Sequence, residues 1–248
     1  MSGPDWLTAR PIAHRGLHDA AAGVIENTAS AFAAAIAGNY AIECDVQVSA
    51  DGEAIVHHDA VLGRLTEGDA PLAAMTSSAL RQIAFNSSSD RMQTLSELCA
   101  QVGGRVPLIV EIKSRHDHDT RLVDRVATVL RSYAGPVAAM SFDPWIVSAL
   151  RERAPELTRG IVAERRYDHE EWHELSAGQK FGLAHLLHGF STQPHFIAYR
   201  VKDLPAPAPM IARHLFGLPL LTWTVRTAED RARAARWASQ MIFEGFRP

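Results

Sequence analysis

The strongest constraint on the fold is a regular alternation along the chain. Short apolar, β-rich segments recur at intervals of often about 30 residues, and stretches with helical character lie between them. Strands that alternate with helices pair in parallel, and eight such strands close a barrel. The sequence therefore predicts the α/β class and a (β/α)8 TIM barrel. The predicted strands are Pro11 to Arg15, Tyr40 to Val48, Leu108 to Lys113, Val137 to Phe142, Gly160 to Glu164, Phe196 to Val201, Leu220 to Val225 and Met241 to Glu244.

Two of the intervening stretches illustrate the predicted helices. One extends from Ala29 to Ala37, and another from Thr120 to Tyr133. The second has Leu122, Val126 and Leu130 at i, i+4 and i+8, which forms an apolar stripe along one face of a helix. Such a stripe can pack against a sheet.

Two stretches depart from the repeat. The interval from Tyr40 to Leu108 is too long for one βα unit, and Asp51-Gly52 lies between two alternating apolar runs. Asp-Gly favours the tight turn of a β-hairpin. We therefore expect a hairpin and a short insertion after the second strand. The segment from Asp203 to Pro209 (DLPAPAP) is rich in proline, which predicts a stiff loop.

Composition limits the classes of function. The chain has 248 residues, 47% hydrophobic and 21% charged, which suits one barrel-sized domain over residues 1–248. A net charge of −3 is unlike the strongly basic surfaces that bind nucleic acid or anionic lipid. The first ten residues lack the apolar run of a signal peptide, and no stretch approaches the ~18 apolar residues of a membrane span. We therefore expect a cytoplasmic protein without nucleic-acid or integral membrane contacts. Cys44 and Cys99 are expected to be structural thiols, and the oligomeric state is open.

A group of residues suited to anion chemistry ends the first predicted strand. His14-Arg15-Gly16 combines an imidazole that titrates near neutral pH, a fixed positive charge and a flexible residue at one chain reversal. The same tripeptide is also common at an ordinary turn. Taken alone, it leaves both interpretations open.

The second predicted strand carries two carboxylates on one face. Strand alternation places Glu43 and Asp45 together, with Ile42, Cys44 and Val46 on the other face. Two carboxylates in an apolar segment repel each other and resist desolvation unless a cation lies between them. The pattern therefore favours a site for a hard metal ion over a solvated edge strand.

Two further segments bring charge to the same region. Glu111 and Lys113 share a face of the third barrel strand, which indicates either a third functional carboxylate beside a cation or an internal ion pair. In a barrel these residues converge with those of the second strand at one rim. His57 and His58 follow the expected hairpin and face opposite ways, so at most one points into the site. Alternation does not decide which one.

Taken in order, these segments resemble the glycerophosphodiester phosphodiesterase family, which belongs to the PLC-like phosphodiesterase superfamily of TIM barrels. The resemblance spans nearly the whole chain. The matching motifs are His14-Arg15-Gly16, Glu26-Asn27-Thr28, Glu43-x-Asp45, Asp51-Gly52, His58-Asp59, Thr94-Leu95-Ser96-Glu97-Leu98, Glu111-x-Lys113, Ser141-Phe142-Asp143 and Leu221-Thr222-Trp223-Thr224-Val225.

The resemblance implies hydrolysis of small-molecule glycerophosphodiesters to glycerol 3-phosphate and an alcohol. It implies that His14 and His58 are the general acid and base. Arg15 and Lys113 would hold the phosphate. Trp223 would lie near the alcohol portion of the substrate, with a core tryptophan as the alternative. Which histidine is the acid, whether water or the neighbouring glycerol hydroxyl attacks, and which head group is preferred all stay open.

The resemblance also implies metal dependence. Glu43, Asp45 and Glu111 would ligate one divalent cation. Because all three ligands are oxygen donors, the set suits Mg²⁺ or Ca²⁺ better than Zn²⁺. Which of the two ions is physiological stays open.

The chain departs from the family pattern at two points. Ile25 stands where the family usually has proline before Glu-Asn-Thr, a change that affects loop stiffness more than chemistry. The chain ends in Glu244-Gly245-Phe246-Arg247-Pro248, where the family usually has a Thr-Asp-x-Pro-like turn. Neither departure removes an implied ligand or histidine.

Two rival functions remain. A lysophospholipase D-like enzyme would need an exposed apolar docking element. Leu186-Leu187 and Leu215-Phe216 are candidates, although such residues in helix-like segments lie more often in the core. A barrel that binds glycerophosphodiesters without cleaving them would be favoured by loss of a ligand or histidine, and none is lost.

Three further residues stay outside the implied site. His116 and His118, after the third barrel strand, are expected in a solvated loop, where a substrate contact is still open. Lys202, after the sixth predicted strand, either reaches a phosphate or faces solvent.

Overall fold

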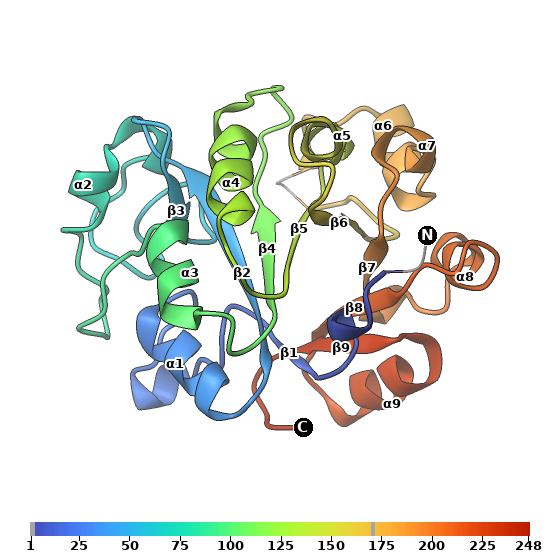
Figure 1. Cartoon of the computed structure of the whole chain (residues 1–248), viewed down its shortest axis with the longest axis horizontal. Helices are drawn as coiled ribbons and strands as arrows, with labels where there is room; N and C mark the ends of the chain where they lie inside the picture. Colours follow the sequence, from blue (N-terminus) through green and yellow to red (C-terminus); the bar gives the residue numbers. More distant parts are fainter. Residues whose placement is uncertain (1–2, 170–171) are drawn as a thin grey trace.

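The computed structural model describes residues 3–169 and 172–248, and its strands form one closed parallel barrel (Figure 1). Within these ranges eight parallel strands pair in the order β1, β2, β4, β5, β6, β7, β8, β9, and β9 pairs again with β1. The predicted TIM barrel is confirmed, with strand ends within one or two residues of those expected. The strands are β1 (Ile12–Ala13), β2 (Ala41–Val48), β4 (Leu108–Ile112), β5 (Val137–Ser141), β6 (Thr158–Ala163), β7 (Phe196–Arg200), β8 (Leu220–Val225) and β9 (Gln240–Phe243).

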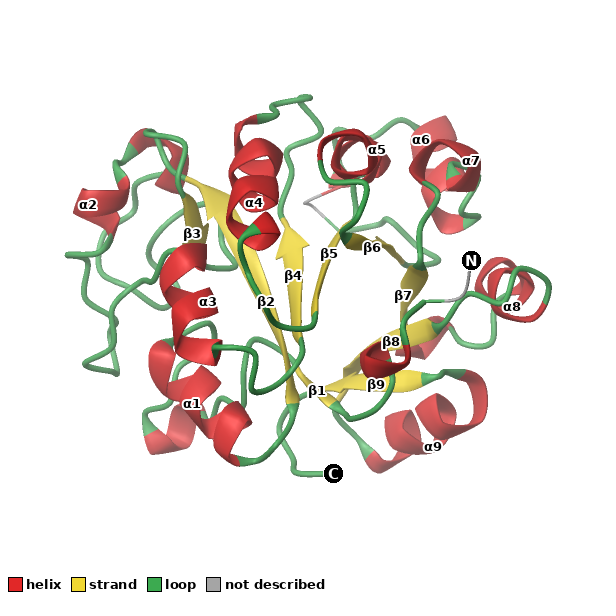
Figure 2. Ribbon diagram, in the orientation of Figure 1, coloured by secondary structure: helices red, strands yellow, loops and turns green. Residues whose placement is uncertain are grey.

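Helices surround the strands, as Figure 2 shows. The predicted helix from Ala29 to Ala37 is found with the same bounds, and the one from Thr120 to Tyr133 is shorter at both ends. Thr94 begins α3 with a capping box, because its side chain accepts from the Glu97 N–H while the Glu97 carboxylate accepts from the Thr94 N–H. The helices are α1 (Ala29–Ala37), α2 (Ser77–Leu80), α3 (Leu95–Val102), α4 (Arg121–Arg131), α5 (Pro144–Arg153), α6 (Ala177–Ala184), α7 (Gly189–Thr192), α8 (Pro207–His214) and α9 (Ala228–Trp237).

Alternation along the strands separates two apolar layers. Cys44 and Val46 on β2 pack outward against the helices, in one core with Phe32 of α1 and Leu98 of α3. A second core fills the barrel interior and includes Leu7 from a 3₁₀ turn near the N-terminus, Ile109 and Phe196. Several of its members, such as Ala41, Ile109 and Phe196, lie in the first half of their strands, and the charged side chains of Glu43, Asp45 and Glu111 lie further along β2 and β4.

The expected hairpin follows β2. Strand β3 (Ala54–Val56) runs antiparallel to β2, with Val56 opposite Val46. Gly52 turns the chain with φ of 78°, a backbone conformation that glycine adopts without steric cost. The insertion that follows has its own small core, which supports the chain where it returns to the rim. That core consists of Ile25, Ile55, Leu62, Leu72, Leu80, Phe85 and Met92.

The proline-rich segment differs from the prediction. Asp203 to Pro209 was expected to be a stiff loop, but a 3₁₀ turn covers Val201–Asp203 and α8 begins at Pro207. Proline fits the first turn of a helix because the N–H groups there have no partner within the helix. The loop prediction is therefore wrong for the last three residues of the segment.

Several apolar side chains expected in the core are exposed. Leu187, Leu215 and Phe216 expose more than half of their surface, whereas Leu186 packs against the buried cluster around β7. Leu215 and Phe216 lie just before β8, at the end of the barrel where the strands begin. Core burial was therefore the wrong prediction for these three residues. No helix in the described part of the chain is both long and apolar enough to span a bilayer.

Candidate active site

A cavity of about 830 Å³ opens at the carboxyl-terminal ends of the strands. Residues from strands far apart in the sequence line it, including His14 after β1, Glu43 on β2, Glu111 on β4 and Trp223 on β8. TIM barrels carry their active sites at this end. The cavity is therefore the candidate active site.

Three carboxylates meet at the base of this site. Glu43 and Asp45 lie on the same face of β2, and Glu111 lies opposite Asp45 in the parallel register of β2 and β4. One oxygen from each of the three side chains lies within 4.8 Å of the others. All three residues are buried, with exposed fractions of 1%, 1% and 8%. The expected convergence of the second and third barrel strands is observed.

The three carboxylates are not equally compensated. Burial raises the pKa of Glu43 well above its usual value, and repulsion from Asp45 and Glu111 adds to the effect. Glu43 Oε2 accepts a hydrogen bond from the Arg15 N–H at 2.9 Å, but Glu43 Oε1 has no hydrogen-bond partner in the described structure. Burial would also raise the pKa of Asp45, but Lys113 and Arg15 outweigh it and hold that pKa well below its usual value.

Lys113 and Arg15 flank Asp45. Lys113 Nζ lies 2.8 Å from Asp45 Oδ1 and 2.5 Å from Glu111 Oε1, while Arg15 Nε lies 3.1 Å from Asp45 Oδ2. The Asn27 amide also donates to Asp45 Oδ2 at 2.9 Å. Burial would lower the pKa of Lys113, but the two carboxylates raise it above its usual value, so the side chain is charged.

His14 follows β1 and points into the cavity. Its Nδ1 lies 2.8 Å from Glu244 Oε2, and its Nε2 lies 4.0 Å from Glu43 Oε2. Burial lowers the pKa of His14 to about 4, although the hydrogen bond to Glu244 opposes the shift. The imidazole is therefore neutral near pH 7.

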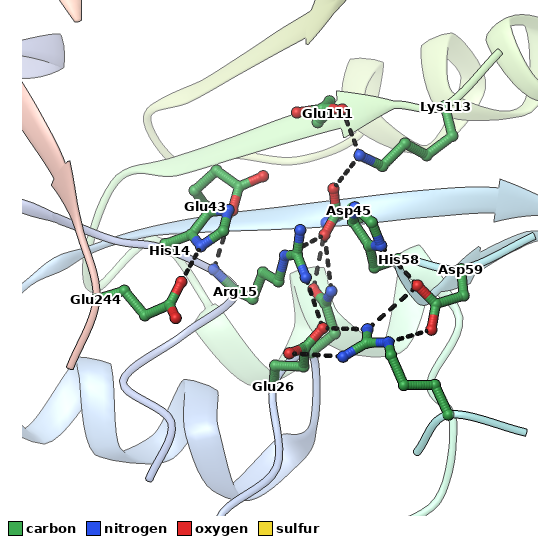
Figure 3. A network of polar contacts seen from close by, with 12 residues as sticks. His14, Arg15, Glu26, Glu43, Asp45, His58, Asp59, Glu111, Lys113 and Glu244 are labelled. Atoms are coloured by element: carbon green, nitrogen blue, oxygen red, sulfur yellow. Dashed lines mark hydrogen bonds and ion pairs between the residues drawn. The ribbon is translucent and has the colours of Figure 1, made fainter. Parts of the chain in front are cut away.

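The structure distinguishes the two adjacent histidines. His57 is 2% exposed and its ring lies against Phe85, with centroids 6.3 Å apart. His58 lines the cavity, and its Nδ1 lies 2.7 Å from Asp59 Oδ1. In Figure 3, His14 lies beside Glu43 and His58 beside Asp45, so the two imidazoles flank the carboxylates.

A chain of ion pairs connects Arg15 to His58 (Figure 3). Arg15 Nη1 lies 2.7 Å from Glu26 Oε1, which also accepts from Arg64 Nη2 at 2.7 Å. Arg64 Nε in turn donates to Asp59 Oδ2 at 2.6 Å. The hydrogen bonds from Arg64 and the attraction of Arg15 lower the pKa of Glu26 to about 2, although burial opposes the shift. The guanidinium of Arg15 is thus held between Asp45 and Glu26.

Several residues that make these contacts could not be assigned a function from the sequence. Glu26 and Asn27 belong to a recognised motif, yet the sequence does not say which residues they contact. Arg64 lies in the insertion, where nothing in its surroundings marks it. Glu244 directly follows β9, and its position at the end of a barrel strand is a signal that could have identified it.

The remaining candidates occupy the periphery of the cavity. Trp223 lines it and packs edge-on against Phe142, with centroids 5.4 Å apart. His116 also lines the cavity, whereas His118 stacks on Trp145 at 5.0 Å. Lys202 lies 2.8 Å from Asp230 in an ion pair.

A closed parallel barrel with carboxylates and imidazoles gathered at its carboxyl-terminal rim defines a TIM-barrel enzyme with an acidic, histidine-flanked site. The model of the glycerophosphoryl diester phosphodiesterase family matches residues 14–246, and the chain belongs to that family. It is accordingly an enzyme of the phosphoric diester hydrolase class.

Individual relatives agree with this membership. A glycerophosphodiester phosphodiesterase from Caldanaerobacter subterraneus subsp. tengcongensis is 27% identical over 232 residues, which cover 90% of this chain and 88% of the relative. A phosphodiesterase from Oleispira antarctica, solved in complex with the product sn-glycerol-3-phosphate, has a TM-score of 0.76 at 18% identity, covering 94% of this chain and 91% of that one. A glycerophosphodiester phosphodiesterase from Thermotoga maritima has a TM-score of 0.71 at 22% identity, covering 94% and 92%. The two solved structures share the barrel fold.

Proposed function

We propose that this chain hydrolyses glycerophosphodiesters to glycerol 3-phosphate and a free alcohol, as one domain over residues 1–248. The observation that carries the proposal is a cluster of three buried carboxylates, two of which line one cavity together with two imidazoles, in a family member. The product bound to the Oleispira antarctica relative supports the same product here. The exposed Leu215 and Phe216 lie at the opposite end of the barrel from the cavity, which favours a small-molecule substrate over a lipid at a membrane surface.

The reaction in this proposal depends on one divalent cation held by Glu43, Asp45 and Glu111. The donor set fits, because three carboxylate oxygens lie within 4.8 Å of one another and Glu43 Oε1 has no hydrogen-bond partner among the described residues. Mg²⁺ and Ca²⁺ are hard cations that prefer oxygen ligands, so either ion suits this set of carboxylates. When bound, such an ion supplies positive charge that neutralises the substrate phosphate and polarises its phosphorus.

His14 and His58 carry the proton transfers. One imidazole takes the proton from the attacking oxygen, and the other gives a proton to the alcohol oxygen as its bond to phosphorus breaks. An alkoxide leaves poorly without that proton. Both rings face the same cavity and each has Nδ1 engaged by a carboxylate, which supports Nε2 as the atom that exchanges protons.

Arg15 and Lys113 hold the phosphate. Both are cations beside the three carboxylates, so they can contact phosphate oxygens that extend beyond the cluster. Trp223 lines the same cavity further out, next to Phe142, and would contact the alcohol portion of the substrate.

The test is an assay of the purified protein with glycerophosphocholine and glycerophosphoethanolamine. Release of glycerol 3-phosphate is measured with Mg²⁺, with Ca²⁺ and with excess chelator. We expect turnover with at least one of the two ions and none with chelator. Glu111→Gln should abolish turnover, whereas the matched control Glu229→Gln, at an exposed ion pair with Arg233, should not. Failure of both ions to support cleavage of any glycerophosphodiester would refute the proposal.

A further inference from the structure

Glu244 contacts His14 from the last strand of the barrel. Its Oε2 lies 2.8 Å from His14 Nδ1, although the two residues are 230 positions apart in the sequence. Glu244 follows β9 directly, and β9 pairs with β1, which ends just before His14. The closing strand of the barrel therefore delivers a carboxylate to the imidazole that follows the opening strand.

Arg226 contacts both oxygens of this carboxylate. Arg226 Nε donates to Glu244 Oε1 at 3.2 Å, and Arg226 Nη2 donates to Oε2 at 2.9 Å. A two-point contact fixes both the position and the plane of a carboxylate. The Arg226 side chain is 56% exposed, and surface ion pairs of this kind add at most about 1 kcal/mol to folding stability. A contribution to folding stability therefore explains the Arg226–Glu244 ion pair poorly.

The contact determines which ring nitrogen of His14 faces the site. The Glu244 carboxylate only accepts hydrogen bonds, because the hydrogen bonds from His14 and Arg226 keep its pKa below the usual value despite burial. Nδ1 must then carry a hydrogen and donate it. Nε2 is left on the cavity side, 4.0 Å from Glu43 Oε2. A neutral imidazole held in this tautomer has its free lone pair at Nε2.

His58 is held in the same manner by different residues. Its Nδ1 contacts Asp59, and Arg64 contacts both oxygens of Asp59, at 2.6 and 3.2 Å. A carboxylate and an arginine thus stand behind each of the two imidazoles. The two arrangements come from unrelated parts of the chain. Their similarity therefore indicates that each imidazole requires a carboxylate held by an arginine, and that the arrangement is not a feature of one loop.

We propose that Glu244 and Arg226 form a positioning pair that holds His14 as the Nδ1–H tautomer with Nε2 directed at the substrate phosphate. The assignment rests on the proposed role of His14 in proton transfer. Neither residue touches the reacting atoms, so removal of the pair should lower kcat and leave KM for the substrate nearly unchanged.

Glu244→Gln is the sharpest test, because it keeps the length and shape of the side chain. The amide has one acceptor oxygen where the carboxylate has two, and it has no charge, so His14 and Arg226 compete for that oxygen and the Nδ1–H tautomer is held more weakly. We expect kcat to fall by at least about tenfold, as when the outer partner of a functional histidine is lost, and by up to about 10⁴-fold, as when the aspartate behind a catalytic histidine becomes asparagine. The matched control is Glu229→Gln, which removes a carboxylate from an exposed arginine pair on α9 and should leave kcat unchanged.

Nitrogen NMR of the His14 ring provides a readout that does not depend on turnover. In the unmodified protein Nδ1 should have the shift of a protonated ring nitrogen and Nε2 that of an unprotonated one, without added metal ion. In Glu244→Gln the two shifts should move towards each other or exchange. Arg226→Gln, at an exposed position, should retain the fold and show the same change in smaller degree, with kcat lowered by about tenfold.

The outcomes separate the two proposals. An unmodified protein that cleaves no glycerophosphodiester would refute the proposed function, while the NMR shifts would still test the contact. Wild-type kcat in Glu244→Gln, or ring shifts that do not change, would overturn the positioning role. If Glu244→Gln does not fold, the decision falls to Arg226→Gln, whose unchanged kcat and shifts would equally overturn it.

Discussion

Replacing Glu43 by glutamine should increase stability while it removes activity. Glu43 is 1% exposed, its Oε1 has no hydrogen-bond partner in the described structure, and two other carboxylates lie beside it. Burial and this repulsion raise its pKa well above the usual value, so the ionised side chain is held in the fold at a cost. Glutamine has nearly the same shape and no charge to desolvate.

The size of the effect follows from the cost of an uncompensated buried charge. Relief of such strain is worth about 1–3 kcal/mol, within the range found when buried ion pairs are replaced by hydrophobic residues of similar volume. For a chain of this length, about 1 kcal/mol shifts Tm by about 2–4 °C. We therefore expect Glu43→Gln to melt about 2–12 °C above the unmodified protein in chelator.

The sign of the pH dependence gives a second check. The pKa of Glu43 is raised in the folded protein, so the folded protein binds this proton more tightly than the unfolded chain does. Its contribution to stability is therefore lost as pH rises from the usual glutamate pKa, about 4.3, towards the raised value. The advantage of Glu43→Gln over the unmodified protein should grow over that interval.

Added Mg²⁺ or Ca²⁺ should narrow this difference in Tm, and should reverse it where the advantage of Glu43→Gln is below about 2.7 kcal/mol. An ion at one hundred times its Kd stabilises the protein that binds it by about 2.7 kcal/mol. The unmodified protein should gain that stabilisation, and Glu43→Gln should gain little of it. Calorimetric melting of both proteins and of the control Glu229→Gln, with and without ion, measures this change in the difference. A Glu43→Gln protein that melts below the unmodified one in chelator would contradict the reasoning.

Three further predictions concern other parts of the molecule. His58→Ala should lower kcat by about 10²- to 10⁴-fold, as loss of a general acid or base does, with little change in Tm because His58 is partly exposed; unchanged turnover would exclude the role. Trp223→Ala should raise KM for glycerophosphocholine by about tenfold, equivalent to about 1.4 kcal/mol of lost aromatic contact; an unchanged KM with a lowered Tm would indicate a core residue instead. Thr94→Ala removes the capping box of α3 and should cost about 1 kcal/mol, measured by urea unfolding; a midpoint equal to that of the unmodified protein would refute this estimate.

The sequence was sufficient to predict the barrel fold and to predict which strand faces carry the carboxylates. Strand alternation has a period of two, so Glu43 and Asp45 had to share a face once β2 was recognised. Parallel pairing then brought Glu111 opposite Asp45. These are local rules applied to short segments, which explains why the strand ends lie within two residues of those predicted.

Helix starts and exposure of apolar residues were less predictable. Proline at Pro207 disfavours a helix interior but suits its first turn, and the sequence does not say which position it occupies. Leu215 and Phe216 resemble core residues in composition, yet they lie on a connection outside the barrel. Burial depends on which elements pack beside a residue, and local sequence does not contain that information.

The amino-acid sequence alone determined that carboxylates and imidazoles would occur at strand ends, because strand periodicity and motif order depend only on neighbours along the chain. Only the tertiary structure decided their partners. It buried His57 against Phe85 and directed His58 into the cavity. It also brought Glu244 into contact with His14, although the two residues are 230 positions apart in the sequence. The reason is physical: barrel closure joins the first and last strands in space, and a contact made by closure has no counterpart in the spacing of residues along the chain.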